Sequence, residues 1–281
     1  MKLLIEKFKR SFTTLASLKV ILDDYQKQLE AGEAYTGMSM REISSAYRSY
    51  KEQFRRRENF AASYVQRHCK AGDLFVEENN RYKIRPELVQ GESDAAIADY
   101  QAAIFNFLAL ETDRLVERNI EIERLILEND SKATFAFIHS LYESEDFRNY
   151  GQLFEIVSYA ILKVYFEHFG FVLNRFSTTF SNDGGMDFIA SAGIYQVTTQ
   201  VNDKKVIGDL CKQKGTKKVL VFSKLTDKQF QHYLAQDGVT DIITGQDLKT
   251  HFLGWLSSRE AFKPTIYRVL EVIQQEFKRE L

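Results

Sequence analysis

Hydrophobic residues recur at three- and four-residue steps through the first third of the chain, the spacing that places them on one face of an α-helix. This pattern predicts three helices, over residues 13–30, from Ser39 towards Phe54, and from about Asn59 to Lys70. Ser39 and Glu42 fit a capping box at the start of the second helix. Alternating residues on either side of Asn79-Asn80 then predict a short β-hairpin over residues 74–84.

From Tyr150 onwards, short strand-like runs alternate with helix-like runs. We expect strands over residues 171–176, 186–190, 194–199, 218–222 and 241–244, and helices over residues 151–167, 206–214, 226–236, 247–256 and 265–278. The run Lys218–Phe222 is almost wholly apolar, as in a buried parallel strand. This order predicts an α/β unit, within a chain that is α+β overall, in which helices flank a mixed sheet with right-handed crossovers in its second half.

One long helix, from about Ser93 to Glu128, is predicted between these two regions. Its apolar face packs against a core, against the C-terminal domain or against a second copy of the chain; the face is formed by Ile97, Ile104, Leu108, Leu115, Ile122 and Ile126. The distribution of charged residues also separates the N-terminal region from the long helix. Residues 41–83 carry ten Lys and Arg against six Asp and Glu, whereas residues 91–148 carry five against thirteen. We therefore predict three parts, residues 1–90, a helical connector over residues 91–149, and residues 150–281.

The N-terminal part has the order of elements of a winged-helix module, three helices followed by a hairpin. Its basic residues are the candidates for DNA contacts, because Lys and Arg bind phosphates and the wing of such a module lies against the DNA. Ser44, Ser45 and Arg48 are candidates for reading base edges. The predicted DNA-binding set is Arg48, Arg55, Arg56, Arg67, Lys70, Arg81 and Lys83.

The composition limits the other classes of function. Hydrophobic residues make up 44% of the chain, enough for a packed core, and the net charge of −1 means that any nucleic-acid surface is local. Cys69 and Cys211 are isolated, and neither a signal peptide nor a membrane span is recognisable, so we expect a cytoplasmic protein. Neither a phosphate-binding glycine loop nor a nucleophile elbow occurs, and the five histidines share no ligand spacing.

The candidate chemistry lies between Asn182 and Gln200. Asp187 begins one strand, Gln196 lies on the next, and the backbone carbonyl of Val197 adds a third oxygen. Magnesium prefers such oxygen ligands and uses them to bind near a phosphate, where it activates water. Gly184 and Gly185 keep the approach to Asp187 free of side chains.

These residues resemble the PD-(D/E)XK nuclease superfamily, and most of all the Mrr-type restriction endonucleases. The similarity covers roughly residues 150–256 and rests on Phe154-Glu155 in a helix, Gly170-Phe171-Val172, Asp183-Gly-Gly-Met-Asp187, Tyr195-Gln196-Val-Thr, and the segments 218–223 and 241–248. The resemblance implies a restriction-endonuclease-like fold and Mg²⁺ as cofactor. It implies that Asp187 and Gln196 are metal ligands and that Glu155 is an auxiliary acid.

Thr198 departs from the family pattern, which has a lysine at this position in its Gln-x-Lys variant. A threonine hydroxyl supplies no positive charge, and losing such a stabiliser typically raises the barrier by on the order of 2.7 to 4 kcal/mol. Two explanations stay open. Either a lysine elsewhere replaces it, with Lys204, Lys205 and Lys163 as candidates, or the site is weakened.

The sequence therefore predicts an Mg²⁺-dependent endonuclease of restriction or defence type that cuts double-stranded DNA. Two cuts require two active sites, so we expect a homodimer. The predicted catalytic residues are Asp187, Gln196, Glu155, Thr198 and Lys205, and the predicted metal ligands are Asp187, Gln196, Val197 and Glu155. The alternative is a non-catalytic DNA-binding protein or regulator with a degenerate nuclease fold. A third reading keeps the nuclease and makes RNA or branched DNA its substrate.

Overall fold

The structure is a computed structural model of the 281-residue chain. It describes residues 7, 12–53, 63–143, 151–176, 186–199, 201, 203–258 and 262–280. The contacts between residues divide the chain into two compact units, unit 1 (residues 1–118 and 280–281) and unit 2 (residues 119–279). The division falls inside helix α6 (Asp94–Glu128). Among the described residues, no helix combines the length and apolar character that crossing a membrane requires.

Unit 1 contains the three predicted helices and the predicted hairpin. The helices are α2 (Phe12–Glu30), α3 (Met40–Gln53), α4 (Ser63–Ala71) and α5 (Pro86–Val89), followed by the first part of α6, and the strands are β1 (Phe75–Glu78) and β2 (Arg81–Ile84). The capping box is confirmed, because the Ser39 amide donates to Glu42 at 2.6 Å and the Glu42 amide donates to the Ser39 hydroxyl at 3.3 Å. Asn79 and Asn80 form the hairpin turn with positive φ angles, a conformation that asparagine tolerates well.

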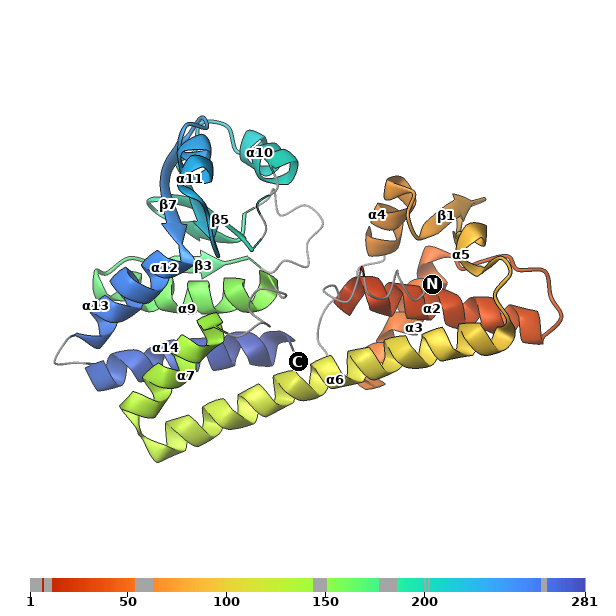
Figure 1. The fold of residues 1–281 in the computed structure, drawn as a ribbon, viewed down its shortest axis with the longest axis horizontal. Helices are drawn as coiled ribbons and strands as arrows, with labels where there is room; N and C mark the ends of the chain where they lie inside the picture. Colours follow the sequence, from red (N-terminus) through yellow and green to blue (C-terminus); the bar gives the residue numbers. More distant parts are fainter. Residues whose placement is uncertain are drawn as a thin grey trace. The chain divides into compact units, whose positions relative to one another are not determined.

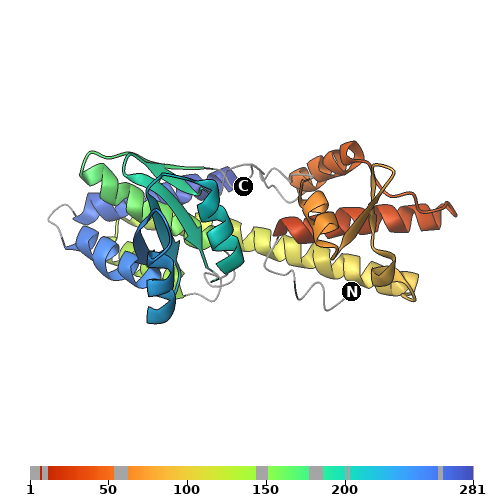
Figure 2. The ribbon, with the colours of Figure 1, turned by 90° about the horizontal axis from the view of Figure 1, so that it is seen from above.

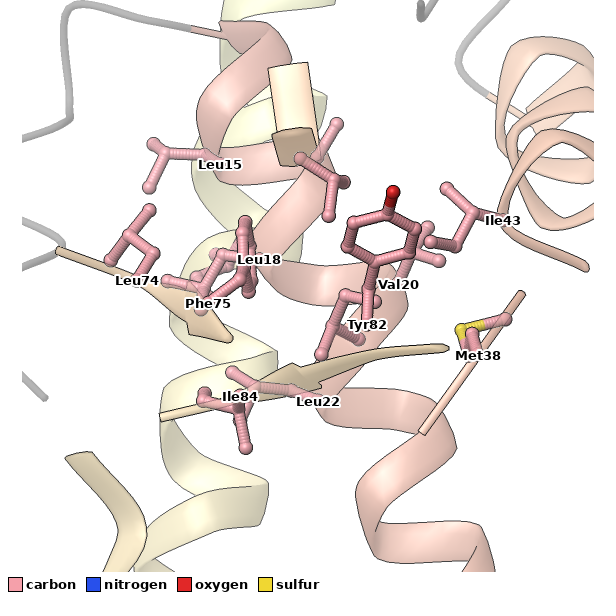
Figure 3. Packing of buried hydrophobic residues seen from close by; sticks show 14 of the residues in the cluster. Leu15, Leu18, Val20, Leu22, Met38, Ile43, Leu74, Phe75, Tyr82 and Ile84 are labelled. Carbon is pink, nitrogen blue, oxygen red and sulfur yellow. The ribbon is translucent and has the colours of Figure 1, made fainter. Parts of the chain in front are cut away.

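A third extended segment joins this hairpin. The amide of Met38 donates to the carbonyl of Tyr82 at 2.9 Å, and the amide of Tyr82 donates back to Met38 at 2.7 Å. The core lies between these strands and α2. Figure 3 shows this packing, to which α2 contributes Leu15, Leu18, Val20 and Leu22 and the other elements contribute Ile43, Leu74, Phe75 and Ile84.

Unit 2 is built around a five-stranded mixed sheet, so the predicted α/β class is confirmed at this level. The strands are β3 (Leu173–Arg175), β4 (Phe188–Ala190), β5 (Gly193–Thr198), β6 (Lys218–Phe222) and β7 (Val239–Thr244), hydrogen-bonded in that order. The first three strands are antiparallel and the last three are parallel. The strand β5 is therefore where the sheet changes from antiparallel to parallel pairing. Figure 2 shows this sheet from above.

Helices cover both faces of the sheet. The helices of this unit are α7 (Ser131–Glu143), α9 (Gly151–His168), α10 (Asp203–Lys212), α11 (Asp227–Leu234), α12 (Gly245–Asp247), the π-helical segment η1 (Leu248–Leu253), α13 (Gly254–Ser257) and α14 (Phe262–Glu280). On one face α9 lies between the sheet and α14 (Figure 1), with Tyr159 of α9 against Phe188 of β4. On the other face, Val206 of α10 and Tyr233 of α11 pack with Phe222 of β6.

Two glycines in unit 1 allow a direct test of the Met38–Tyr82 pairing. Gly32 and Gly37 both have positive φ, but a Cβ at residue 37 would lie 2.5 Å from the Tyr82 carbonyl oxygen, whereas a Cβ at residue 32 meets nothing within 4 Å. We expect Gly32→Ala to destabilise the fold by about 1 to 2 kcal/mol through backbone strain alone. Gly37→Ala should destabilise it by roughly 1 to 3 kcal/mol more, because of the clash. Urea unfolding measures both, and equal losses would show that the pairing does not constrain residue 37.

Candidate metal centre

Asp187 lies directly before β4, and hydrogen bonds on both sides fix its backbone. Its amide donates to the carbonyl of Tyr195 on β5 at 3.0 Å, and its carbonyl accepts from the amide of Phe176, which follows β3, at 2.9 Å. The residue is only 7% exposed. The sheet therefore determines where its carboxylate lies.

The carboxylate of Asp187 contacts two of the three other predicted ligand residues, Gln196 and Val197. Its Oδ2 atom accepts from the backbone amide of Val197 at 2.6 Å and from Nε2 of Gln196 at 2.9 Å. Hydrogen bonds to an ionised acceptor are stronger than neutral ones and offset part of the free energy lost when the charge is buried. The structure thus brings Asp187, Gln196 and Val197 together in one place.

The oxygens at this place fit a hard cation. Within the described part of the chain, Oε1 of Gln196 is buried and has no hydrogen-bond partner. A buried acceptor of this kind normally finds a partner, and a metal ion is one such partner. The amide of Val197 faces Asp187, and since the amide and carbonyl of one residue in a strand point to the same side, its carbonyl lies on that side too.

A metal site made only of acids, histidines or cysteines is not found in the described part of the chain. No group of three or more His, Cys, Asp or Glu side chains that could hold a metal occurs among the residues that the structure describes. The predicted site instead combines the carboxylate of Asp187 with neutral oxygens of Gln196 and Val197. Magnesium suits such a set, because it is often bound by one or two carboxylates and keeps several waters.

Glu155 takes part in a buried ion-pair network. It lies on α9 and is 6% exposed, and its Oε1 atom accepts from Nε of Arg175 at 2.7 Å. Nη1 of Arg175 donates to Oε2 of Glu276 on α14 at 2.8 Å, and Arg279 contacts the other oxygen of Glu276 at 2.6 Å. Sequence reasoning did not identify Arg175 or Glu276, because they are 101 residues apart and share no local motif.

The lysines that could replace the positive charge absent at Thr198 lie in different surroundings. Thr198 is half-buried, and alternation along β5 places it on the same face as Gln196. Lys163 is 3.1 Å from Glu167 and also lies over the ring of Tyr159, so it already has partners on α9. Lys204 is exposed on α10. The side chain of Lys205 lies outside the described residues, as do Asp183, Gly184 and Gly185.

The pKa of Glu167 supports a stable ion pair between Glu167 and Lys163. Burial alone would raise the pKa of the Glu167 carboxyl, but hydrogen bonds from Arg268 and Lys163 outweigh burial and lower that pKa. Glu167 therefore stays ionised and keeps Lys163 in an ion pair near the C-terminal end of α9.

The predicted DNA contacts in unit 1 fall into three groups. Arg48 on α3 and Arg67 and Lys70 on α4 are exposed. Arg81 is 3.1 Å from Glu42 and donates to the carbonyl of Gly37 at 2.6 Å, and Lys83 is 2.6 Å from Glu78, so these two wing residues already have protein partners. Arg55 and Arg56 lie outside the described residues.

Comparisons with known proteins add nothing to this geometry, since no family model, no curated protein and no solved structure matches the chain.

The contacts of Asp187 predict how its substitutions affect stability. Asp187→Ala leaves the amides of Val197 and Gln196 without their acceptor, so we expect it to reduce the free energy of unfolding by about 1 to 3 kcal/mol. Asp187→Asn keeps an oxygen for Val197, and the Gln196 amide can turn to present Oε1, so its loss should be smaller. Urea unfolding in the presence of EDTA measures both, and equal losses would mean that these hydrogen bonds contribute little.

Proposed function

We propose that the protein is a metal-dependent endonuclease that hydrolyses phosphodiester bonds in double-stranded DNA. The observation that carries this proposal is the pairing of the buried Asp187 carboxylate with Oε1 of Gln196, a buried acceptor without a hydrogen-bond partner in the described structure. The mixed sheet with helices on both faces is in keeping with the resemblance to the PD-(D/E)XK nucleases.

Each residue of the site has a role in this proposal. Asp187 supplies the charged oxygen, and Gln196 and the Val197 carbonyl supply neutral oxygens that hold the cation without adding charge. When bound there, Mg²⁺ would neutralise charge on the phosphate and lower the pKa of a bound water. Glu155 would orient that water or hold a second cation.

The positive charge that Thr198 lacks comes, in this proposal, from the start of α10. This helix begins at Asp203, shortly after β5 ends at Thr198, and carries Lys204 and Lys205 in its first turn. Lys204 is exposed, whereas Lys163 is occupied by Glu167. A flexible lysine stem can bring its amine to a phosphate bound near the end of β5.

Unit 1 would bind the DNA. The antiparallel pairing of Met38 with Tyr82 adds a third strand segment to the hairpin, which supports a winged-helix architecture for α2, α3, α4, β1 and β2. Arg48, Arg67 and Lys70 offer exposed positive charges for phosphates. Cutting both strands of a duplex would use two copies of the chain, and restriction or defence is the role that fits such an enzyme.

A second candidate function is supported by a specific observation. Oδ2 of Asp187 already accepts two protein donors, which stabilises the start of β4 without any metal. Together with Thr198 in place of a lysine, this supports a DNA-binding protein whose nuclease fold no longer cuts. The two functions differ in whether adding a divalent cation leads to DNA cleavage.

Plasmid cleavage separates these two functions. We expect the wild type to nick or linearise supercoiled DNA with Mg²⁺ and to stop when EDTA is added, because the cation is needed to activate water. Asp187→Asn should reduce the rate at least about 100-fold, as does losing a key electrostatic group elsewhere. DNA binding by both proteins in EDTA should be equal. Cleavage by Asp187→Asn at the wild-type rate would place the activity elsewhere, and binding without cleavage by the wild type would favour the second candidate.

The contribution of unit 1 is tested by its exposed cations. We expect Arg67→Ala combined with Lys70→Ala to weaken binding to duplex DNA similarly for all sequences and to reduce the salt dependence by about one ion for each lost phosphate contact. Lys83→Ala is the matched control, since Lys83 is already paired with Glu78. Binding is measured by fluorescence anisotropy at several salt concentrations. An equal loss for Lys83→Ala would indicate that net charge alone, and not the surface of α4, determines affinity.

A further inference from the structure

Arg175 connects elements that are distant in sequence, because both its side chain and its backbone make contacts. Its guanidinium lies between Glu155 of α9 and Glu276 of α14, at 2.7 and 2.8 Å, and its side chain is only 3% exposed. The side chains of these two glutamates are 8% and 4% exposed. A buried arginine with two carboxylate partners has its geometry strongly determined, because the planar guanidinium donates in fixed directions.

The backbone of Arg175 is fixed to the strand that begins with the candidate ligand. Arg175 pairs in register with Phe188, the residue after Asp187, and the amide of the following residue, Phe176, donates to the carbonyl of Asp187 at 2.9 Å. One residue therefore relates the carboxylate of Glu155 to the backbone of Asp187. A movement of the Arg175 side chain would move Glu155 relative to the strand that carries Asp187.

We propose that Arg175 is a positioning residue of the candidate metal centre, which holds the Glu155 carboxylate in the place where it takes part in binding the cation or its water. This inference rests on the proposed function. Partners that orient the ligands of a metal typically change its affinity by about 10- to 100-fold when they are replaced.

If Arg175 had only a structural role, it would use the same contacts, but replacing either of its two partners would have the same effect. Glu155 and Glu276 are both buried and both accept from Arg175, so a structural staple depends on each of them. Glu276 also contacts Arg279, on its own helix. If Arg175 serves the metal centre, Glu155 affects cation binding and Glu276 does not, which makes Glu276→Gln a matched control for Glu155→Gln.

The test measures Mn²⁺ binding by calorimetry without DNA, and in parallel the Mg²⁺ concentration that gives half-maximal cleavage. We expect Arg175→Lys and Glu155→Gln each to weaken Mn²⁺ binding at least about tenfold. Glu276→Gln should change it less than about threefold. Arg175→Lys combined with Glu155→Gln should be no weaker than Glu155→Gln alone, because the arginine acts through that glutamate. Thermal unfolding of each variant reports the structural contribution separately.

Three outcomes would overturn the inference: wild-type Mn²⁺ affinity in Arg175→Lys, equal losses in Glu155→Gln and Glu276→Gln, or additive losses in the double variant. If Arg175→Lys does not fold, Arg175→Gln with Glu276→Gln replaces it, since this pair removes one charge of each sign, and Glu276→Gln alone is its reference. Failure of the proposed function gives a different result, because the wild type would then bind no Mn²⁺ and cut no DNA.

Discussion

The hydrogen bonds that the Asp187 carboxylate accepts from Val197 and Gln196 are the interaction on which the candidate site depends. They join the beginning of β4 to the middle of β5. β5 is the central strand of the sheet and pairs antiparallel with β4 and parallel with β6. The acid is consequently held by the central strand of the sheet, and a small change in the pairing of β4 with β5 would move Asp187, Gln196 and Val197 together.

The Asp187 carboxylate and the side-chain oxygen of Gln196 are both buried, so the partners of these groups matter for stability and for binding. An ionised carboxylate loses much hydration when it is buried, and the two donors offset part of that loss. Gln196 is placed differently, because its amide nitrogen is satisfied while its buried oxygen has no partner in the described structure. Glu155 and Arg175 form the second charged group, on the face that α9 covers.

Local patterns in the sequence predicted most of the elements, because periodicity, caps and turns act over a few residues. The strand over residues 218–222 was predicted with its observed ends, and the long helix was predicted with its observed last residue, Glu128. The strand predicted over residues 171–176 is shorter, since only Leu173–Arg175 pair while Phe171 and Val172 are exposed. The helix predicted over residues 247–256 contains the π-helical turn η1, which no residue pattern signalled.

The contacts of charged side chains were harder to predict, because they join segments far apart in the chain. Arg81 and Lys83 were expected to face DNA, yet Arg81 pairs with Glu42 of α3 and Lys83 pairs with Glu78 across the hairpin. Arg175 drew no attention in the sequence, although it links Glu155 to Glu276. The meeting of Asp187 with Gln196 was predictable, in contrast, because a tight hairpin places adjacent strands side by side.

A crystal structure with Mn²⁺ and its anomalous scattering would show whether Asp187 and Gln196 form a cation site. We expect an anomalous peak at roughly 2 to 2.2 Å from a carboxylate oxygen of Asp187 and from Oε1 of Gln196, the distance typical of small divalent cations bound by oxygen. A peak at other residues, or no peak in a well-ordered site at millimolar Mn²⁺, would contradict it.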